Sequence, residues 1–169
     1  MRKNIAMHMA TTPRSSEWIR SNGMCLESLL VGKSNIPQAG QGGFAQHLIP
    51  KGEIVVPAPT LHIMDRDVLM RFDSDGTELG PQLLLNYCLG HPESSFLLCP
   101  NTNAILANHC SMRKKECGPK GPNAAFRWST GWDPTSDVWR KMSLQDIAKE
   151  KARGLSMELY ALRDIRPGT

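Results

Sequence analysis

The amino-acid sequence predicts a mainly β fold with short helices, an α+β arrangement, in a chain of 169 residues. Short apolar stretches broken by proline and asparagine recur through the middle of the chain, as in the strands of an irregular sheet. Residues 54–56 are β-branched and follow a Pro-Lys-Gly-Glu turn. Residues 155–161 alternate between apolar and polar side chains, the period of a strand with one buried face.

Residues 1–14 have no clear periodicity and are interpreted as a flexible leader, so the single predicted domain comprises residues 15–169. Ser15 or Ser16 is expected to cap a short helix, because a serine hydroxyl accepts a hydrogen bond from an unpaired amide of the first turn. Asn22 and the glycine after it are expected to end this helix.

Seven strands and three further helical segments are expected after this helix. The strands cover residues 26–31, 43–49, 54–56, 96–99, 104–107, 124–128 and 155–161. Two helical segments are expected at residues 65–72 and 82–88. The third begins at Ser143, where Asp146 completes a capping box, and ends near Gly154.

The composition is that of an ordinary globular protein, with 40% hydrophobic and 21% charged residues. No stretch is long and apolar enough for a membrane span, and the basic start of the chain is followed by too short an apolar run for a signal peptide. The formal charge of +4 comes from scattered residues and does not demand nucleic acid. We therefore expect neither membrane nor direct nucleic-acid binding.

Five cysteines at irregular spacing cannot all pair within one chain. The simpler interpretation is a reducing compartment, nuclear or cytoplasmic. The set Cys99, His109, Cys110 and Cys117 is also considered as a structural zinc site, although its spacing matches no standard Cys-x2-Cys knuckle. No metal site is therefore predicted.

Three short motifs occur in order along the chain. The first is Gly40-Gln41-Gly42-Gly43, followed by the turn at residues 50–53. Glycines at such a turn reach positive φ at little cost and let a ligand approach the backbone closely. The second is Asn108-His109, followed after an insertion by Pro-Asn-Ala at residues 122–124. The third is the strand and turn at residues 159–169.

Taken together, these motifs resemble those of SET domains, the protein-lysine methyltransferase family, over residues 24–169. Two departures stand out within the second motif. Cys110-Ser111 reverses the usual Ser-Cys order, and residues 112–121 interrupt the signature before Pro122. In the first motif, Gly43 stands where the family more often has a larger apolar residue.

The resemblance implies a β-clip type fold of small sheets around a knot-like core, whose C-terminal segment is expected to be missing here. It implies that S-adenosylmethionine is held by backbone groups around Gly40, Gln41, Gly42 and Gly43 and contacted by Asn108 and His109. The family's catalytic tyrosine is expected beyond Thr169, so no catalytic residue is assigned.

The activity implied is methyl transfer to the side-chain amine of a protein lysine, in a histone or another protein. Tyr87, Phe126 and Tyr160 are candidate aromatics for the lysine channel or for the core. The alternative is a catalytically inactive SET-like binding module. A hydrolase is not expected, because the sequence has no Gly-x-Ser-x-Gly elbow and no cysteine in a recognisable catalytic context.

Overall fold

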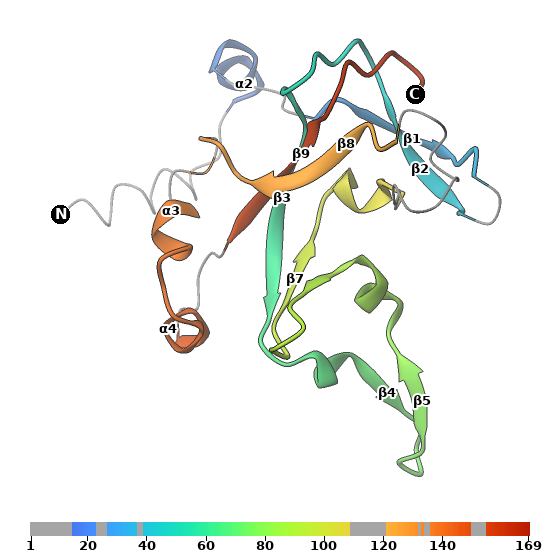
Figure 1. Cartoon of the computed structure of the whole chain (residues 1–169), viewed down its shortest axis with the longest axis vertical. Coiled ribbons are helices and arrows are strands. Elements are labelled where there is room, and N and C mark those ends of the chain that lie inside the picture. The colour runs from blue at the N-terminus through green and yellow to red at the C-terminus, as the bar shows by residue number, and fades with distance from the viewer. Residues whose placement is uncertain are drawn as a thin grey trace.

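The structure, a computed structural model, describes residues 15–22, 27–36, 39–108, 121–131, 133, 136–149 and 155–169. The predicted β-rich class with short helices is confirmed (Figure 1). The strands are β1 (Leu29–Lys33), β2 (Gln41–Ala45), β3 (Ile54–Ile63), β4 (Met70–Phe72), β5 (Glu78–Pro81), β6 (Leu89–Gly90), β7 (Leu97–Pro100), β8 (Ala124–Trp128) and β9 (Ser156–Ala161). The helices are α2 (Ser16–Asn22), α3 (Ser136–Trp139), α4 (Leu144–Lys149) and the 3-10 helices η1 (Arg66–Leu69), η2 (Leu83–Tyr87) and η3 (Asn103–Leu106).

All described strand pairs are antiparallel and form three sheets. The largest has the order β6-β7-β3-β9-β8, and β1-β2 and β4-β5 each form a two-stranded sheet. In Figure 1 the β1-β2 hairpin lies near the start of β8, and the β4-β5 hairpin projects away at the opposite side of the molecule. None of the helices within these described ranges is long and apolar enough to cross a bilayer.

Strand β3 is much longer than predicted and runs through two prolines. The sequence placed a strand only at residues 54–56, because proline removes a backbone donor. The carbonyls of Pro57 and Pro59 accept hydrogen bonds from Thr102 Oγ1 and Asn101 N, at 2.7 and 3.2 Å. Since N and C=O of one residue point to the same side of a strand, the missing N–H groups face away from β9. The prolines therefore interrupt no bond between β3 and β9.

Strand β9 lies between β3 and β8, and residues on both of its faces are buried. Leu159 and Ala161 belong to the main core cluster together with Val55, Val56 and Ala58 of β3. The prediction of a single buried face is wrong, because Glu158 and Ser156 on the other face are buried as well. Their polar groups are bonded there by other side chains, Glu158 by Arg127 and Thr130 and Ser156 by Asp133.

The predicted helix termini are confirmed where the structure describes them. Ser15 Oγ accepts a hydrogen bond from Trp18 N at 3.1 Å, and α2 ends at Asn22. Ser143 Oγ accepts from Asp146 N at 3.2 Å and donates to the Asp146 carboxylate at 2.7 Å, which is the predicted capping box. Residues 150–154, where this helix was expected to end, lie outside the described residues, as does the proposed leader.

Two of the predicted segments have a different conformation. Residues 104–107 were expected to form a strand and instead belong largely to η3, which is capped by Thr102. The helix expected at residues 65–72 is the single 3-10 turn η1, after which Phe72 lies in β4. The segment 82–88 is helical as predicted, in the form of η2. In each case the residues are too few for periodicity to separate a strand from a turn of helix.

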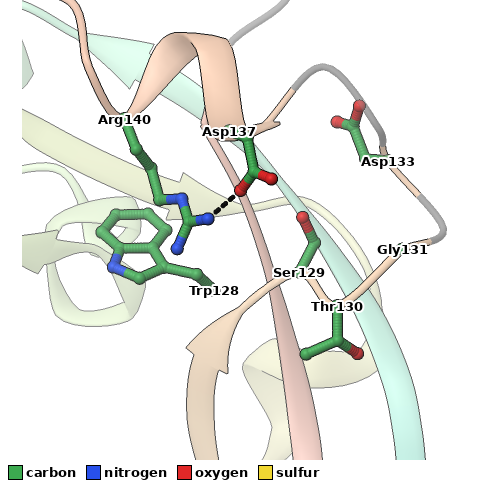
Figure 2. Close-up of a pocket in the computed structure, with 7 residues that line it drawn as sticks. All are labelled: Trp128, Ser129, Thr130, Gly131, Asp133, Asp137 and Arg140. Atoms are coloured by element: carbon green, nitrogen blue, oxygen red, sulfur yellow. Dashed lines mark hydrogen bonds and ion pairs between the residues drawn. The ribbon is translucent and has the colours of Figure 1, made fainter.

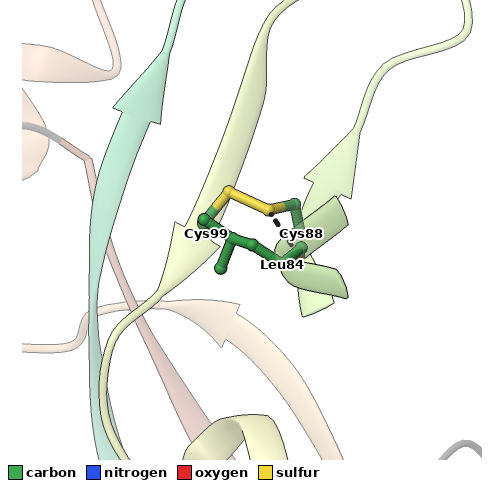
Figure 3. Close-up of a disulfide and its surroundings, with 3 residues drawn as sticks. All are labelled: Leu84, Cys88 and Cys99. Atoms are coloured by element: carbon green, nitrogen blue, oxygen red, sulfur yellow. Dashed lines mark hydrogen bonds between the residues drawn. A yellow bond between two sulfur atoms is a disulfide. The ribbon is translucent and has the colours of Figure 1, made fainter. Parts of the chain in front are cut away.

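The segment 64–95, between β3 and β7, contains the β4-β5 hairpin and is called the arm here. A disulfide joins Cys88 at the base of the arm to Cys99 of β7 (Figure 3). Figure 3 also shows Leu84 beside the bond, its carbonyl oxygen 3.2 Å from Cys88 Sγ. The expectation that all cysteines are reduced is therefore wrong for this pair, and Cys99 is no longer a candidate zinc ligand. The nuclear or cytoplasmic location remains a prediction.

His62 joins β3 to the loop before β9. Its Nε2 accepts a hydrogen bond from Leu155 N at 2.7 Å, so this nitrogen carries no proton. The imidazole makes edge-to-face contacts with Phe96 and Trp139, with centroids 5.4 and 5.8 Å away. Burial lowers the pKa of His62 below the ordinary value of 6.5.

We expect the free energy of unfolding to decrease as the pH falls below 6.5, the ordinary pKa of histidine. The unfolded chain binds the His62 proton at a higher pH than the folded chain, so this stability is complete above the ordinary pKa and is lost as the pH falls through the folded pKa. Urea unfolding at about pH 7.5 and about pH 5.5 measures the change. His62→Gln retains a hydrogen-bond acceptor that does not titrate, and it should reduce the difference. An equal loss in both proteins would contradict the assignment to His62.

Candidate functional site

The glycine motif lies at the start of β2, across from β1. Gly40 has a φ of +66°, and its carbonyl accepts a hydrogen bond from Ser34 N at 2.9 Å. Gln41 then begins β2 opposite Lys33. Gly40 and Gln41 are exposed, so their backbone and the Gln41 side chain are accessible to a ligand.

The structure brings Gly42 and Asn108 together. A Cβ atom at Gly42 would lie 3.4 Å from Asn108 Nδ2 and 3.7 Å from the Cα of Ser34. Asn108 Nδ2 also donates a hydrogen bond of 3.3 Å to Ser34 Oγ, across 74 positions of sequence. Helix η3 contacts β1, β2 and β3, and Asn108 follows its C-cap directly after Ala107. The packing of η3 against these strands therefore places the second motif, at Asn108, beside the glycine motif.

Gly43 has a structural explanation of its own. A Cβ atom at Gly43 would lie 3.0 Å from Leu29 Cδ1, closer than such contacts normally come. Leu29 is 8% exposed and belongs to the main core cluster. Leu29 thus occupies the space that a larger apolar residue at position 43 would need for its side chain. His109, the remaining predicted site residue, lies outside the described residues.

Ser34 was not predicted as part of the site. Besides the bond from Asn108, its hydroxyl accepts a hydrogen bond from Ile36 N at 3.1 Å. A serine in a short polar turn has no pattern that distinguishes it from other turn residues. Its role becomes visible only when η3 is placed against the hairpin.

The three aromatic side chains considered for the lysine channel do not lie on one face of the fold. Phe126 pairs with Leu159 and packs on the main core cluster, whereas Tyr160 pairs with Ala125 on the opposite face of the sheet. The Arg127 guanidinium already covers the Tyr160 ring, 4.2 Å from its centroid. Tyr87 lies on η2 in the arm.

The face of β9 that carries Tyr160 also contains a buried ion pair. Glu158 is fully buried, and its carboxylate accepts hydrogen bonds from Arg127 Nε at 2.6 Å and from Thr130 Oγ1 and N at 2.8 and 3.1 Å. Burial raises the pKa of Glu158, whereas the hydrogen bonds from Thr130 and Arg127 lower it. The lowering is the larger effect, so the pKa lies below its usual value. Arg127 also donates to the Gly52 carbonyl at 3.1 Å, which ties β8 to the turn before β3.

A pocket of about 380 Å³ lies at the far end of β8 from the glycine motif (Figure 2). It is lined by Trp128, Ser129, Thr130, Gly131, Asp133, Asp137 and Arg140. Asp137 and Arg140, three positions apart at α3, form an ion pair on one side of it, and Asp133 accepts a hydrogen bond from Ser156 at 2.5 Å. The Ser129 hydroxyl is buried and has no hydrogen-bond partner among the residues that the structure describes. None of the predicted site residues that the structure describes lines this pocket, and its charged groups are already engaged.

Comparison with known proteins gave similarities at the level of structure. No family model matches the chain, and no curated protein matches it. The chain is similar to the crystal structure of a "putative histone methyltransferase" from Plasmodium falciparum, with 20% sequence identity and a TM-score of 0.49. The alignment covers 85% of this chain and 88% of that one. The assignment of function therefore depends on the site itself.

Proposed function

We propose that the chain is a SET-type domain that binds S-adenosylmethionine and serves methyl transfer to the side-chain amine of a protein lysine. The observation that carries the proposal is the meeting of Gly42 on β2 with Asn108 after η3, because two motifs of the expected cofactor site converge. Hydrogen bonds of 2.8 and 3.1 Å also join Ala45 to Gly168 and Thr169, so the third motif lies beside the end of β2. This neighbourhood supports the proposed knot-like core.

The described residues fit part of an S-adenosylmethionine site. Gly40 is exposed and has a positive φ, so a bound molecule can approach its backbone closely. Gly42 is buried, and its missing side chain leaves room for the Asn108 amide beside β2. Asn108 is exposed, and its amide keeps an acceptor oxygen and a second N–H beyond the bond to Ser34. An amide with a free donor and a free acceptor suits the hydrogen-bonding edge of a purine.

In the proposed mechanism the chain acts by holding and aligning. S-adenosylmethionine, when bound, supplies an electrophilic methyl group on a positively charged sulfur. The backbone at residues 40–43 and the Asn108 side chain hold one reactant, so that the lysine amine meets it in an aligned geometry, which removes much of the entropic barrier. Desolvation of the lysine favours its neutral form, the form that has a lone pair. This scheme needs no protein nucleophile, and we assign no catalytic residue.

We expect Asn108→Ala to weaken the binding of S-adenosylmethionine about tenfold, the upper range for the loss of a hydrogen-bonding amide. The combined Asn108→Ala and His109→Ala protein should bind more weakly still. Gly42→Val should also reduce binding, because its branched side chain would displace the Asn108 amide. Calorimetric titration of the full chain with S-adenosylmethionine measures these changes.

Asn86→Ala is the matched control, since Asn86 is an exposed asparagine on η2, away from β2. It should bind the cofactor as the unaltered chain does. Thermal unfolding of each variant separates a loss of the site from a loss of the fold. A folded chain without measurable affinity for S-adenosylmethionine would contradict the proposed methyl transfer and would favour the inactive binding module.

A further inference from the structure

The arm, residues 64–95, has a concentration of exposed apolar side chains. It holds seven of the sixteen large hydrophobic residues that are exposed in the described part of the chain. Leu83 and Val68 are the most exposed, at 69% and 64%, and Phe72 and Leu79 on the hairpin are exposed by 58% and 55%. Gathered exposed apolar residues of this kind mark interaction surfaces.

These apolar residues occupy both the hairpin and its base. Phe72 on β4 pairs with Glu78 on β5, directly before Leu79. At the base, η1 and η2 contact each other, and Gln82 N donates a hydrogen bond of 2.7 Å to Leu69 O. Val68 on η1 and Leu83 on η2 therefore belong to neighbouring elements. In Figure 1 the hairpin extends outward from the rest of the fold.

The arm is acidic, whereas the whole chain is basic. It contains six carboxylates and only two arginines, so its formal charge is −4, whereas that of the whole chain is +4. The carboxylates belong to Asp65, Asp67, Asp73, Asp75, Glu78 and Glu93, and the arginines are Arg66 and Arg71. The charge of this surface therefore opposes that of the chain to which it belongs.

None of these carboxylates forms an ion pair within the arm, every residue of which is described. The Arg66 guanidinium donates instead to the carbonyls of His91 and Ser94, at 3.3 and 2.5 Å. Asp65 and Asp73 accept hydrogen bonds from neighbouring groups of the arm, such as Ser95 and Thr77. The remaining four carboxylates, at Asp67, Asp75, Glu78 and Glu93, are exposed without a cation.

We propose that the arm is a docking surface for a basic segment of a partner protein that also carries apolar side chains. Acidic groups without cations attract lysine and arginine, and the exposed Phe72 and Leu79 give apolar residues of the same segment a surface to cover. The acidic surface repels nucleic-acid phosphates. What the inference says of the substrate rests on the proposed function. The partner is then a lysine-rich substrate that the arm binds at a segment away from the target lysine, because the hairpin and the β1-β2 site lie at opposite sides of the molecule.

Fluorescence anisotropy tests the docking with three labelled peptides of equal length. One alternates lysine and leucine, the second replaces each leucine by serine, and the third replaces each lysine by glutamate. The full chain should bind the lysine-leucine peptide most tightly, the lysine-serine peptide more weakly, and the glutamate-leucine peptide not at all. Rising salt should weaken the binding, because exposed charges are screened.

Two sets of arm variants should each reduce affinity for the lysine-leucine peptide about tenfold. The first neutralises the four carboxylates with Asp67→Asn, Asp75→Asn, Glu78→Gln and Glu93→Gln. The second removes apolar surface with Phe72→Ser and Leu79→Ser. The matched controls are Glu53→Gln and Leu48→Ser, because both residues are exposed and lie outside the arm. The controls should leave the affinity unchanged.

Two results would overturn the inference: no binding of the lysine-leucine peptide, or binding that the arm variants do not change. Self-association that the arm variants abolish, without peptide binding, would instead assign the surface to a second copy of this chain. Titration with S-adenosylmethionine keeps the two proposals separate. Cofactor binding without peptide binding would overturn the docking alone, whereas peptide binding without cofactor binding would overturn the methyl-transfer proposal alone.

Discussion

Replacing Arg127 by methionine is expected to lower the free energy of unfolding by about 3–5 kcal/mol. The guanidinium lies 2.6 Å from the fully buried Glu158 carboxylate, and methionine keeps most of the apolar length of the side chain. The carboxylate would keep its hydrogen bonds from Thr130, but it would lose the charge of Arg127 while it stays buried itself. Urea unfolding near neutral pH measures the loss.

Arg140→Met provides the matched control, because Arg140 pairs with Asp137 while both side chains are exposed. Its loss should be about 1 kcal/mol or less, as for other exposed pairs. The double variant Arg127→Met and Glu158→Leu should lose less stability than the sum of its single changes, since no buried charge is left behind. If Arg127→Met and Arg140→Met proved equally mild, the Glu158 carboxylate would have to be solvated or protonated in the folded chain.

The strands that the sequence predicted well are those whose signal is local. Residues 124–128 form β8 as expected, because an apolar run between turn residues favours a strand wherever the run lies in the fold. The continuation of β3 past Pro57 is possible because the side of the strand where Pro57 lacks an N–H is not the side that pairs with β9. That side is set by β9, more than ninety residues further along the chain. No local pattern contains this information.

The same distinction applies to the candidate site. Gly42 and Asn108 were selected from short motifs, and the fold places them in contact. Ser34, which joins them, belongs to an unremarkable turn and was missed. Glu158 was assigned to an exposed face because alternation in β9 suggests one, yet Glu158 is fully buried beside Arg127 and Thr130. The groups that cover this face, Arg127 and Thr130, are about thirty positions away in the sequence, so alternation within β9 cannot predict the burial.

Loss of the Cys88–Cys99 disulfide is expected to lower the free energy of unfolding by about 3 kcal/mol. The bond closes a loop across 11 positions of sequence, and the open chain gains the conformational freedom of that loop when unfolded. Cys99 is 1% exposed and packs with Ile63, Leu69 and Leu97, so the bond joins the base of the arm to a core cluster. Urea unfolding with and without reductant measures the difference.

The variant Cys88→Ala with Cys99→Ala separates the bond from any other effect of reductant. Reduction should destabilise the unaltered chain and leave the variant unchanged, and two more thiols should react in the unfolded, reduced chain than before reduction. Because β6 pairs with β7 next to the bond, the arm should become more sensitive to proteases when the bond is lost, while the β3-β9 pairing remains protected. Equal stability with and without reductant, or an unchanged number of reactive thiols, would mean that the two cysteines are free. Cys99 would then contribute to stability only as a small apolar residue of its cluster.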